Sequence, residues 1–399
     1  MSVSKERIGV MGGTFNPIHE GHLAMARAAM RSAKLDRVLF LPDSVPPHKK
    51  DIAPAEDRWR MTVAAVAGEK DFEPCRMELD REGTTYTCDT LLALRAQEPK
   101  AELFYLIGTD TLLQLKNWSR YEQVLTLCTF IVCARAVEGV SAAEVDAERR
   151  RLIGLGGRFL SAEMEPVDVS STALREAIQR DEPTPLLSPA VREYCGARGL
   201  YGAAPRVPRA EKWLAKLFAD LTPRRFAHTL GVAYSARALA RNHGLDLEKA
   251  EIAALLHDCA KCLPLREMQE IAVRNNVTQD REILESGALL HAPVGAWLAE
   301  HAYGVTDPEI LHAIACHTTG CPGMSRFDMA VYLADKIEPG RPAYPALTRV
   351  RMLAPLSLEK AMVYSIERTV EYERGKGHAL HPQSLETLEW LKSQPENMS

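Results

Sequence analysis

The fold of the first half of the chain is decided by one stretch, Gly12-Gly13-Thr14-Phe15-Asn16-Pro17-Ile18-His19-Glu20-Gly21-His22. It follows an apolar run and leads into an amphipathic pattern over Leu23–Ser32, so it predicts a strand, a glycine turn and a helix start. The glycine pair lets the backbone approach a phosphate closely, and a helix start offers free N–H groups and a positive dipole end. His19 and His22 lie three residues apart on one helix face. The stretch therefore predicts a site for the oxygens of a triphosphate.

Four apolar runs in this half have the length and composition of buried strands. They cover residues 7–11, 37–41, 103–108 and 128–133. Helical patterns separate them. This alternation predicts an α/β fold with a doubly wound parallel sheet, like the Rossmann fold.

The sequence pattern changes after about Ser188. Residues 199–209 bring Gly202, Pro205 and Pro208 close together and have the composition of a linker. From Ala210 onward apolar residues recur at three- and four-residue spacing, which predicts an all-α domain. We therefore expect two domains, covering residues 1–203 and 204–399.

The bulk composition excludes some classes of protein. With 399 residues, 46% of them hydrophobic, the chain can form two separate cores. A formal charge of -4 gives no global field that attracts nucleic acid or an anionic membrane, so any phosphate binding must be local. No apolar run reaches the length of about 18 residues that a membrane span needs. Nine cysteines without a disulfide rhythm indicate reduced thiols, so we expect a cytoplasmic protein. The sequence leaves open whether the chain forms a homo-oligomer.

The opening stretch resembles the signature of the nucleotidyltransferase superfamily, whose T/H-x-G-H core is matched here by His19-Glu20-Gly21-His22. Further blocks are similar, in the same order, to those of the nicotinate-mononucleotide adenylyltransferases. These blocks are residues 45–49 (VPPHK), 86–91 (YTCDTL), 108–110 (GTD) with Trp118, and 169–175 (VSSTALR). The resemblance covers about residues 5–200. It implies transfer of the adenylyl group of ATP to nicotinate mononucleotide, with release of pyrophosphate and with Mg²⁺ accompanying the ATP.

This resemblance also implies roles for individual residues. His19 and His22 hold the ATP phosphates and the transition state. The other residues expected at ATP lie in the turn after the first strand and at a second helix start: Gly12, Gly13, Thr14, Phe15, Ser171, Thr172 and Arg175. In-line attack on the α-phosphate needs positioning and charge neutralisation rather than a covalent protein nucleophile.

Four further positions match the family, and three of them have a second interpretation. Thr87 and Trp118 match positions at the nicotinate ring, where backbone N–H groups favour a carboxylate over an amide, although Trp118 is alternatively a core residue. Asp110 matches a position near the nucleotide, and it is alternatively a helix cap. Lys49 offers a charge to the substrate phosphates or is a solvated surface lysine.

Histidine and aspartate residues stand out beyond the linker: His228, His257, Asp258, His291, His317 and Asp335. Ligands separated by helical lengths suit a metal site inside a helical bundle, because each helix projects one or two donors inward. The adjacent His257 and Asp258 end a very apolar helix. Burying such a pair is unfavourable unless both side chains are coordinated or paired.

Five strings around these residues resemble the bacterial HD-type symmetrical diadenosine-tetraphosphate hydrolases. They are residues 225–233 (RFAHTLGVA), 256–261 (LHDCAK), 290–296 (LHAPVGA), 313–320 (AIACHTTG) and 332–341 (YLADKIEPGR). The similarity runs from about residue 210 to 391. By this resemblance the six ligands carry two metal ions, Asp258 bridges them, and an acidified water attacks the tetraphosphate to give two ADP.

Several points of this interpretation remain open at the level of the sequence. Lys261 and Arg341 either neutralise the phosphate chain or are solvated charges. The family favours two iron ions, and manganese (Mn²⁺) accepts the same donors. The HD domain alternatively acts on another nucleotide or only senses nucleotides.

The remaining histidines and cysteines of the second half are assigned no role. His243, His301 and His312 are interpreted as ordinary core or surface residues. The Cys259-x-x-Cys262 spacing lacks a matching second pair, so we expect no zinc or disulfide there. Cys316 and Cys321 are likewise interpreted as incidental.

Overall fold

The structure is a computed structural model, and it describes residues 5–44, 52–133, 139–165, 167–378 and 380–394. The chain divides into two compact units. The first comprises residues 1–191 and 200–203, and the second comprises 192–199 and 204–399. Residues 192–199 thus group with the second unit, apart from the residues directly before and after them.

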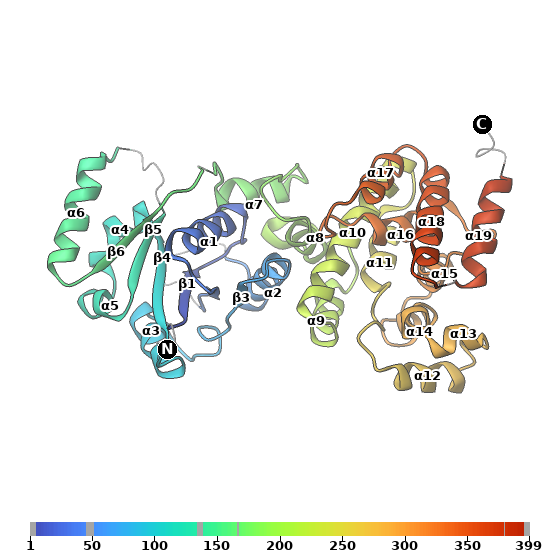
Figure 1. The fold of residues 1–399 in the computed structure, drawn as a ribbon, viewed down its shortest axis with the longest axis horizontal. Helices are drawn as coiled ribbons and strands as arrows, with labels where there is room; N and C mark the ends of the chain where they lie inside the picture. The colour runs from blue at the N-terminus through green and yellow to red at the C-terminus, as the bar shows by residue number, and fades with distance from the viewer. Residues whose placement is uncertain (1–4, 45–51, 134–138, 166, 379, 395–399) are drawn as a thin grey trace. The chain divides into compact units, whose positions relative to one another are not determined.

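A six-stranded parallel sheet forms the centre of the first unit (Figure 1). Its strands are β1 (Arg7–Gly13), β2 (Arg37–Pro42), β3 (Phe72–Pro74), β4 (Glu102–Gly108), β5 (Thr129–Cys133) and β6 (Arg158–Ala162). Their order is β3-β2-β1-β4-β5-β6. From β1 the chain adds β2 and β3 on one side of the sheet and then β4, β5 and β6 on the other side. In sheets with such a change of side, ligands bind outside the carboxyl ends of the strands at that point, here between β1 and β4.

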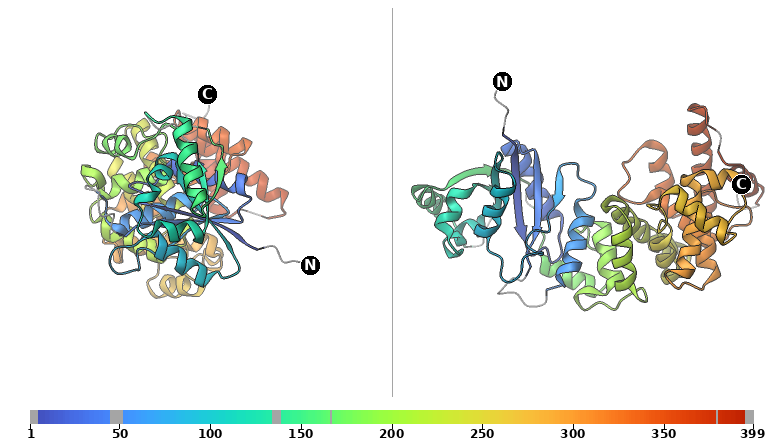
Figure 2. Two further views of the ribbon diagram at one scale, coloured as in Figure 1. Left: turned by 90° about the vertical axis from the view of Figure 1, so that its left-hand side faces the viewer. Right: turned by 90° about the horizontal axis from the view of Figure 1, so that it is seen from below.

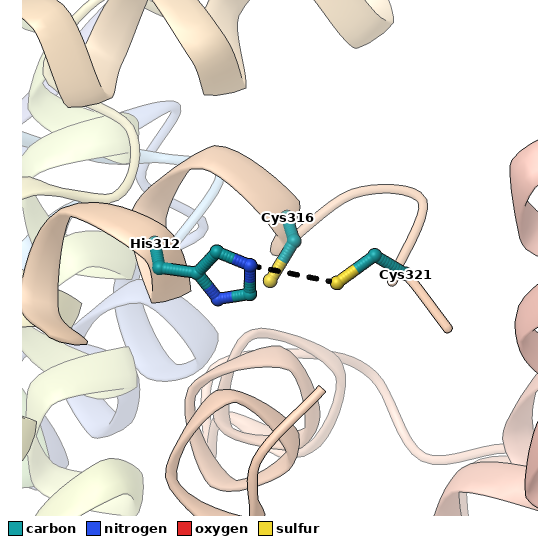
Figure 3. A group of neighbouring side chains, drawn as sticks. All are labelled: His312, Cys316 and Cys321. Carbon is teal, nitrogen blue, oxygen red and sulfur yellow. Dashed lines mark hydrogen bonds between the residues drawn. The ribbon is translucent and has the colours of Figure 1, made fainter. Parts of the chain in front are cut away.

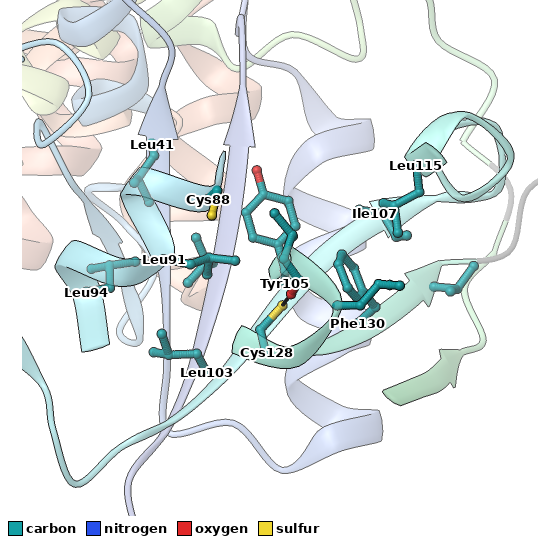
Figure 4. Packing of buried hydrophobic residues seen from close by; sticks show 14 of the residues in the cluster. Leu41, Cys88, Leu91, Leu94, Leu103, Tyr105, Ile107, Leu115, Cys128 and Phe130 are labelled. Atoms are coloured by element: carbon teal, nitrogen blue, oxygen red, sulfur yellow. Dashed lines mark hydrogen bonds between the residues drawn. The ribbon is translucent and has the colours of Figure 1, made fainter. Parts of the chain in front are cut away.

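Helices cover both faces of this sheet. They are α1 (Glu20–Ala33), α2 (Ala55–Val66), α3 (Thr87–Gln97), α4 (Thr109–Gln114), η1 (Leu115–Asn117), α5 (Tyr121–Leu127), α6 (Ala142–Gly154), α7 (Ser171–Gln179), the start of α8 (Pro189–Arg198) and η2 (Leu200–Gly202). On one face Tyr105 and Phe130 pack with Leu91 of α3 and Leu115 of η1 (Figure 4). On the other face Cys133 of β5 contacts α1. The predicted doubly wound α/β fold is thus confirmed.

Every secondary-structure element in the described part of the second unit is a helix, which confirms the predicted all-α half (Figures 1 and 2). Besides the end of α8, its helices are α9 (Ala210–Asp220), α10 (Pro223–His243), α11 (Leu247–Leu256), α12 (Leu265–Arg274), α13 (Arg281–Glu285), α14 (Gly287–His301), α15 (Pro308–Cys316), α16 (Arg326–Ile337), α17 (Pro345–Leu353), α18 (Leu358–Gly375) and α19 (Pro382–Ser393). In the described part of the chain, no helix is long and apolar enough to cross a membrane.

Buried charges fix part of the predicted linker. The Arg206 guanidinium lies 2.7 Å from Glu193 Oε1 and 3.2 Å from Glu251 Oε1. Both carboxylates are buried, and burial together with the neighbouring Glu251 raises the pKa of Glu193 well above its usual range. The predicted linker is therefore attached to the second unit at Arg206, which lies between two buried acids.

Candidate active sites

The turn after β1 is held by a buried arginine. Arg58 of α2 is 1% exposed and donates to the carbonyl oxygen of Thr14 at 2.9 Å. It also pairs with Asp43 Oδ1 at 3.0 Å, and Thr14 Oγ1 donates to the other oxygen of the same carboxylate at 3.0 Å. Phe15 adopts a φ of 47° at the turn. The Gly12–Phe15 backbone is therefore fixed in shape before any ligand arrives.

Two helix starts meet at this turn. His19 caps α1, and its backbone N–H donates to His22 Nδ1 at 3.2 Å. The two imidazole rings lie 3.8 Å apart between centroids, and His19 Nε2 lies 3.1 Å from Ser171 Oγ, at the start of α7. Arg175 of α7 donates to the Asn16 carbonyl oxygen at 3.1 Å. The amino-terminal ends of α1 and α7 thus lie close together, and both helix dipoles favour an anion beside them.

Tyr105 connects this turn to the expected nicotinate positions. A Cβ atom on Gly12 would overlap the Tyr105 hydroxyl oxygen, so Gly12 and this hydroxyl lie in direct contact. Thr87, at the start of α3, acts on the pKa of the Tyr105 hydroxyl, and the Tyr105 ring lies 5.7 Å from that of Trp118, edge to face. Thr87 and Trp118 therefore lie around one tyrosine beside the glycine turn.

Gly12→Ala is expected to destabilise the first unit by about 1–3 kcal/mol, the usual penalty for overpacking. Adding Tyr105→Phe to this variant removes the hydroxyl oxygen that the new methyl group would meet. The next nearest atom, Tyr105 Cζ, is 3.5 Å away. The double variant should therefore recover most of the loss. Calorimetric unfolding of the full chain measures both effects, and strictly additive losses would disprove the proposed contact.

Glu78 is a buried acid on the same side of the sheet. It is 7% exposed and accepts a hydrogen bond from Thr90 Oγ1 at 2.7 Å. Burial raises the pKa of Glu78, and this hydrogen bond opposes the shift only in part. Glu78 and Asp43 also act electrostatically on Tyr105. The sequence analysis gave Glu78 no role, since a single glutamate in a loop has no distinctive spacing.

Because the pKa of Glu78 is raised, we expect this residue to make the stability of the protein depend on pH. Between the ordinary glutamate pKa of about 4.3 and the raised folded value, the native state binds more protons than the unfolded state, so stability falls as the pH rises. Glu78→Gln has no charge to bury. It should therefore melt above wild type at about pH 7.5, and the difference should shrink toward about pH 4.5. A difference in melting temperature that does not change with pH would contradict this origin.

The second unit gathers all six predicted metal ligands in one place. They come from three helices and from the residues that follow two others: His228 on α10, His257 and Asp258 after α11, His291 on α14, His317 after α15 and Asp335 on α16. Ligand atoms fall into two groups in which all atoms lie within 4.8 Å of one another. One group is His228, His257 and Asp258, and the other is Asp258, His291 and His317. Asp258 belongs to both.

The distances support a bridging position for this carboxylate. Asp258 Oδ1 lies 3.1 Å from His291 Nε2 and 3.8 Å from His317 Nε2, whereas Oδ2 lies 3.4 Å from His257 Nε2 and 3.7 Å from His228 Nε2. Each oxygen therefore faces a different histidine pair. Burial opposes ionisation, but the surrounding histidines hold the pKa of Asp258 well below its usual range.

Backbone and carboxylate oxygens orient the four imidazoles. His257 Nδ1 lies 2.6 Å from the Ala254 carbonyl oxygen, and His317 Nδ1 lies 2.7 Å from that of Ile314. The remaining Nδ1 atoms have acceptors as well, Glu338 Oε1 at 3.3 Å for His228 and the Gly287 carbonyl oxygen at 3.3 Å for His291. An acceptor at Nδ1 favours the tautomer that leaves the Nε2 lone pair inward, as in histidines that bind metals.

These donors fit a pair of divalent cations. Within the described residues, the buried Nε2 atoms of His228 and His257 receive no hydrogen bond. Burial lowers the pKa of His291 to about 4 and also lowers that of His317, so both are neutral at physiological pH. Neutral nitrogen lone pairs that face a buried carboxylate are stabilised by a cation between them, and mixed histidine and carboxylate donors suit first-row divalent metals.

Cationic side chains surround this ligand set. Arg225 Nη1 donates to Asp258 Oδ2 at 2.7 Å, and Arg341 Nη2 donates to Asp335 Oδ1 at 2.8 Å. Lys261 Nζ lies 3.1 Å from His291 Nδ1, and burial lowers its pKa. Lys336 Nζ lies 3.8 Å from Asp335 Oδ2. The site thus has a positive border within a chain of negative net charge.

Comparisons with known proteins match both units. Residues 10–177 match the model of the cytidylyltransferase-like family, and residues 225–340 match that of the HD domain. A probable nicotinate-nucleotide adenylyltransferase of Moorella thermoacetica is 39% identical over 200 residues, which are 49% of this chain and 91% of that protein. The symmetrical bis(5'-nucleosyl)-tetraphosphatase of Bacillus subtilis is 41% identical over 184 residues, which are 46% of this chain and 97% of that protein.

The chain belongs to two families, that of the nicotinate-nucleotide adenylyltransferases and that of the symmetrical bis(5'-nucleosyl)-tetraphosphatases. A single relative carries both halves in one chain: the probable nicotinate-nucleotide adenylyltransferase/Ap4A hydrolase of Mycoplasma genitalium is 29% identical over 341 residues, 84% of this chain and 89% of that protein. The adenylyltransferase half and the HD half are thus enzymes of two known families, and the HD half binds divalent metal. The fold and family predictions from the sequence are confirmed.

The structure brings most of the predicted adenylyltransferase residues together. The turn residues Gly12–Phe15 and the two histidines meet the start of α7, which carries Ser171, Thr172 and Arg175. Thr87 and Trp118 join them through Tyr105. Asp110 lies in the first turn of α4, directly after β4, where Gly108 rather than Asp110 is the N-cap. Lys49 and the whole block 45–49 lie outside the described residues.

In the HD half, Lys261 and Arg341 are both in contact with predicted ligands, so neither is an isolated solvated charge. Arg225 and Glu338, which were not predicted from the sequence, contact Asp258 and His228 respectively. Both lie inside strings that resemble the family, at 225–233 and 332–341. Arg225 is three residues before His228 and therefore on the same helix face, a spacing that could have indicated it.

Proposed function

We propose that the chain is a bifunctional enzyme. Its first activity transfers the adenylyl group of ATP to nicotinate mononucleotide, giving deamido-NAD and pyrophosphate. Its second activity hydrolyses diadenosine tetraphosphate symmetrically to two ADP. We assign the first to residues 1–203 and the second to 204–399. The observation that carries the proposal is the position of Asp258 between two histidine pairs, in a chain that has a second, separate phosphate-binding turn.

For adenylyl transfer, a phosphate oxygen of nicotinate mononucleotide attacks the α-phosphorus of ATP, and the bond to the pyrophosphate leaving group breaks. Charge accumulates on the phosphoryl oxygens, so preorganised donors at those oxygens lower the barrier. His22 accepts from the His19 backbone at Nδ1, which leaves its Nε2–H as a donor to the α-phosphate. Ser171, Thr172 and Arg175 bind the β- and γ-phosphates of the MgATP substrate, and Thr87 and Trp118 border the nicotinate ring.

For hydrolysis, water adds to a phosphorus of the tetraphosphate and the central P–O–P bridge breaks, which leaves one ADP on each side. The six ligands would hold two divalent ions, which would supply an acidified water and neutralise phosphate charge. Asp258 would serve both histidine pairs, and Asp335 would complete the ligand set beside His228, whose Nε2 lies 3.1 Å from its Oδ1. Lys261, Arg225 and Arg341 bind the phosphate chain and stabilise the charge of the leaving ADP.

We propose iron for these two sites, with manganese as the alternative ion. Histidine and carboxylate ligands without a thiolate suit Fe²⁺ and Mn²⁺ equally by donor type. To distinguish the two ions, the full chain is stripped of metal with a chelator and reconstituted with each ion under anaerobic, reducing conditions, and the hydrolysis rate is measured. The native ion should restore the highest hydrolysis rate at two equivalents per chain.

One experiment tests the whole proposal on the purified full chain. With MgATP it should convert nicotinate mononucleotide faster than nicotinamide mononucleotide, and with reconstituted metal it should convert diadenosine tetraphosphate to ADP alone. Formation of ATP and AMP from the tetraphosphate would contradict symmetrical cleavage. Binding of the dinucleotide without ADP formation, or faster cleavage of a guanosine polyphosphate, would replace the second activity. Equal rates with both mononucleotides would refute the nicotinate selectivity.

A further inference from the structure

A second group of metal-binding side chains lies in the HD half, outside the HD site. It consists of His312, Cys316 and Cys321, whose ligand atoms all lie within 4.8 Å of one another (Figure 3). The sequence alone gives these three residues no role. His312 and Cys316 lie four residues apart on one face of α15, and Gly320, with a φ of 69°, turns the chain so that Cys321 returns to them.

The geometry of this group is that of ligands around one small ion. His312 Nε2 and Cys321 Sγ lie 3.7 Å apart. In a tetrahedral zinc site with Zn–S of about 2.3 Å and Zn–N of about 2.0 Å, a nitrogen and a sulfur ligand are separated by roughly 3.6 Å. The two atoms therefore already stand at ligand-to-ligand distance, and His312 keeps about half of its side chain exposed, which gives an ion access from solvent.

Asp328 of α16 orients the imidazole. Its Oδ1 lies 3.1 Å from His312 Nδ1, and its Oδ2 accepts from the backbone N–H of Ser325 at 2.8 Å and from Ser325 Oγ at 2.9 Å. Asp328 is 2% exposed. A carboxylate on one ring nitrogen, with the other nitrogen aimed at sulfur, is the arrangement that supports histidines in zinc sites.

The two sulfurs complete a donor set that suits zinc. Cys316 is buried and Cys321 is partly buried, and the Cys321 sulfur lies beside the imidazole of His312. Thiolates are the form that coordinates metals, and soft sulfur donors select Zn²⁺ over Mg²⁺ or Ca²⁺.

We propose that His312, Cys316 and Cys321 form a separate binding site for one Zn²⁺ ion, with Asp328 as the positioning residue for His312. Binding forms two Zn–S bonds and one Zn–N bond, releases the thiol protons of Cys316 and Cys321 to solvent, and leaves a fourth position for water. The site is distinct in its donors from the HD site, whose six ligands include no sulfur. It requires neither of the two proposed activities.

Cobalt substitution tests this site in the full chain. The chelated, reduced protein is titrated with Co²⁺ and followed by absorption in the near ultraviolet. A thiolate-to-cobalt charge-transfer band should appear and saturate by three equivalents per chain, of which two fill the HD site, and Zn²⁺ should then abolish it. Cobalt in the HD site gives no such band because that site has no thiolate. Absence of the band in the wild-type chain would overturn the proposal whatever the variants do.

Variants locate the site. Cys321→Ser and His312→Ala should lose the band or weaken cobalt binding severely, and Asp328→Asn should weaken it about 10- to 100-fold. The matched controls are Cys262→Ser, which removes an exposed cysteine, and His301→Ala, which removes a similarly exposed histidine. Both should keep the band. A band that survives in Cys321→Ser, or that disappears in Cys262→Ser, would assign the thiolate elsewhere. The zinc site would also be overturned if Cys316 and Cys321 form a disulfide on oxidation but bind no cobalt when they are reduced.

Discussion

Asp258→Asn is expected to abolish tetraphosphate hydrolysis, lowering kcat/KM by on the order of 10³-fold or more, while adenylyl transfer by the same chain stays unchanged. The reason is that each carboxylate oxygen faces a different histidine pair, His291 and His317 on one side and His228 and His257 on the other. The amide keeps the shape of the side chain but loses its charge and one of the two oxygens. A single substitution thus affects both metal positions.

Metal analysis and activity should therefore change together. Wild type should hold two HD-site ions per chain and Asp258→Asn at most one, measured after removal of loosely bound metal. Glu300→Gln is the matched control, because Glu300 is an exposed carboxylate on α14, the helix that carries His291. It should retain both ions and full activity. Wild-type hydrolysis by Asp258→Asn would eliminate the bridged two-metal site.

How far the fold could be predicted depended on the burial of each element. The strands β1, β2, β4 and β5 carry continuous apolar runs because they are covered on both faces, and the sequence predicted all four. It missed β3, which has three residues, and β6, in which Arg158 and Ser161 are exposed. Both are edge strands of the sheet, so neither needs two apolar faces.

The candidate metal site could be predicted because its ligand types are rarely buried. His257 and Asp258 follow an apolar helix, and a charged pair there has few explanations other than coordination. The orientation of the imidazoles could not be predicted, since it depends on backbone carbonyl groups such as those of Ala254 and Ile314. Likewise, nothing in the spacing indicated that Tyr105, in the middle of an apolar strand, contacts Gly12.

The zinc-site residues show the opposite case. His312 and Cys316 have a helical spacing that could have been noticed, but Cys321 lies beyond the end of α15. Its return depends on the turn at Gly320, where a Cβ atom would meet Thr387 Cγ2 at 2.8 Å and where a positive φ is adopted. A turn of this kind is set by packing against α19. Local sequence patterns do not report such packing.

His22→Ala is expected to reduce kcat for adenylyl transfer by about 10²- to 10³-fold, the typical effect of removing one preorganised donor at a developing charge. The His19 N–H donates to His22 Nδ1 at 3.2 Å, so the proton of the neutral ring resides on Nε2, which can donate to the α-phosphate. Because this bond strengthens as charge develops, KM for ATP should change far less than kcat. Tetraphosphate hydrolysis by the same protein should be unaffected.

The second variant, His22→Asn, separates catalysis from folding of the helix start. Asparagine can accept from the His19 N–H and keeps the cap of α1, whereas its amide donor is too short to replace Nε2. If His22 acts on the reaction, His22→Asn should remain as stable as wild type in thermal unfolding and yet lose most of kcat. If His22 only caps the helix, His22→Asn should recover the activity that His22→Ala loses, because the capping contact is then the whole contribution of the side chain.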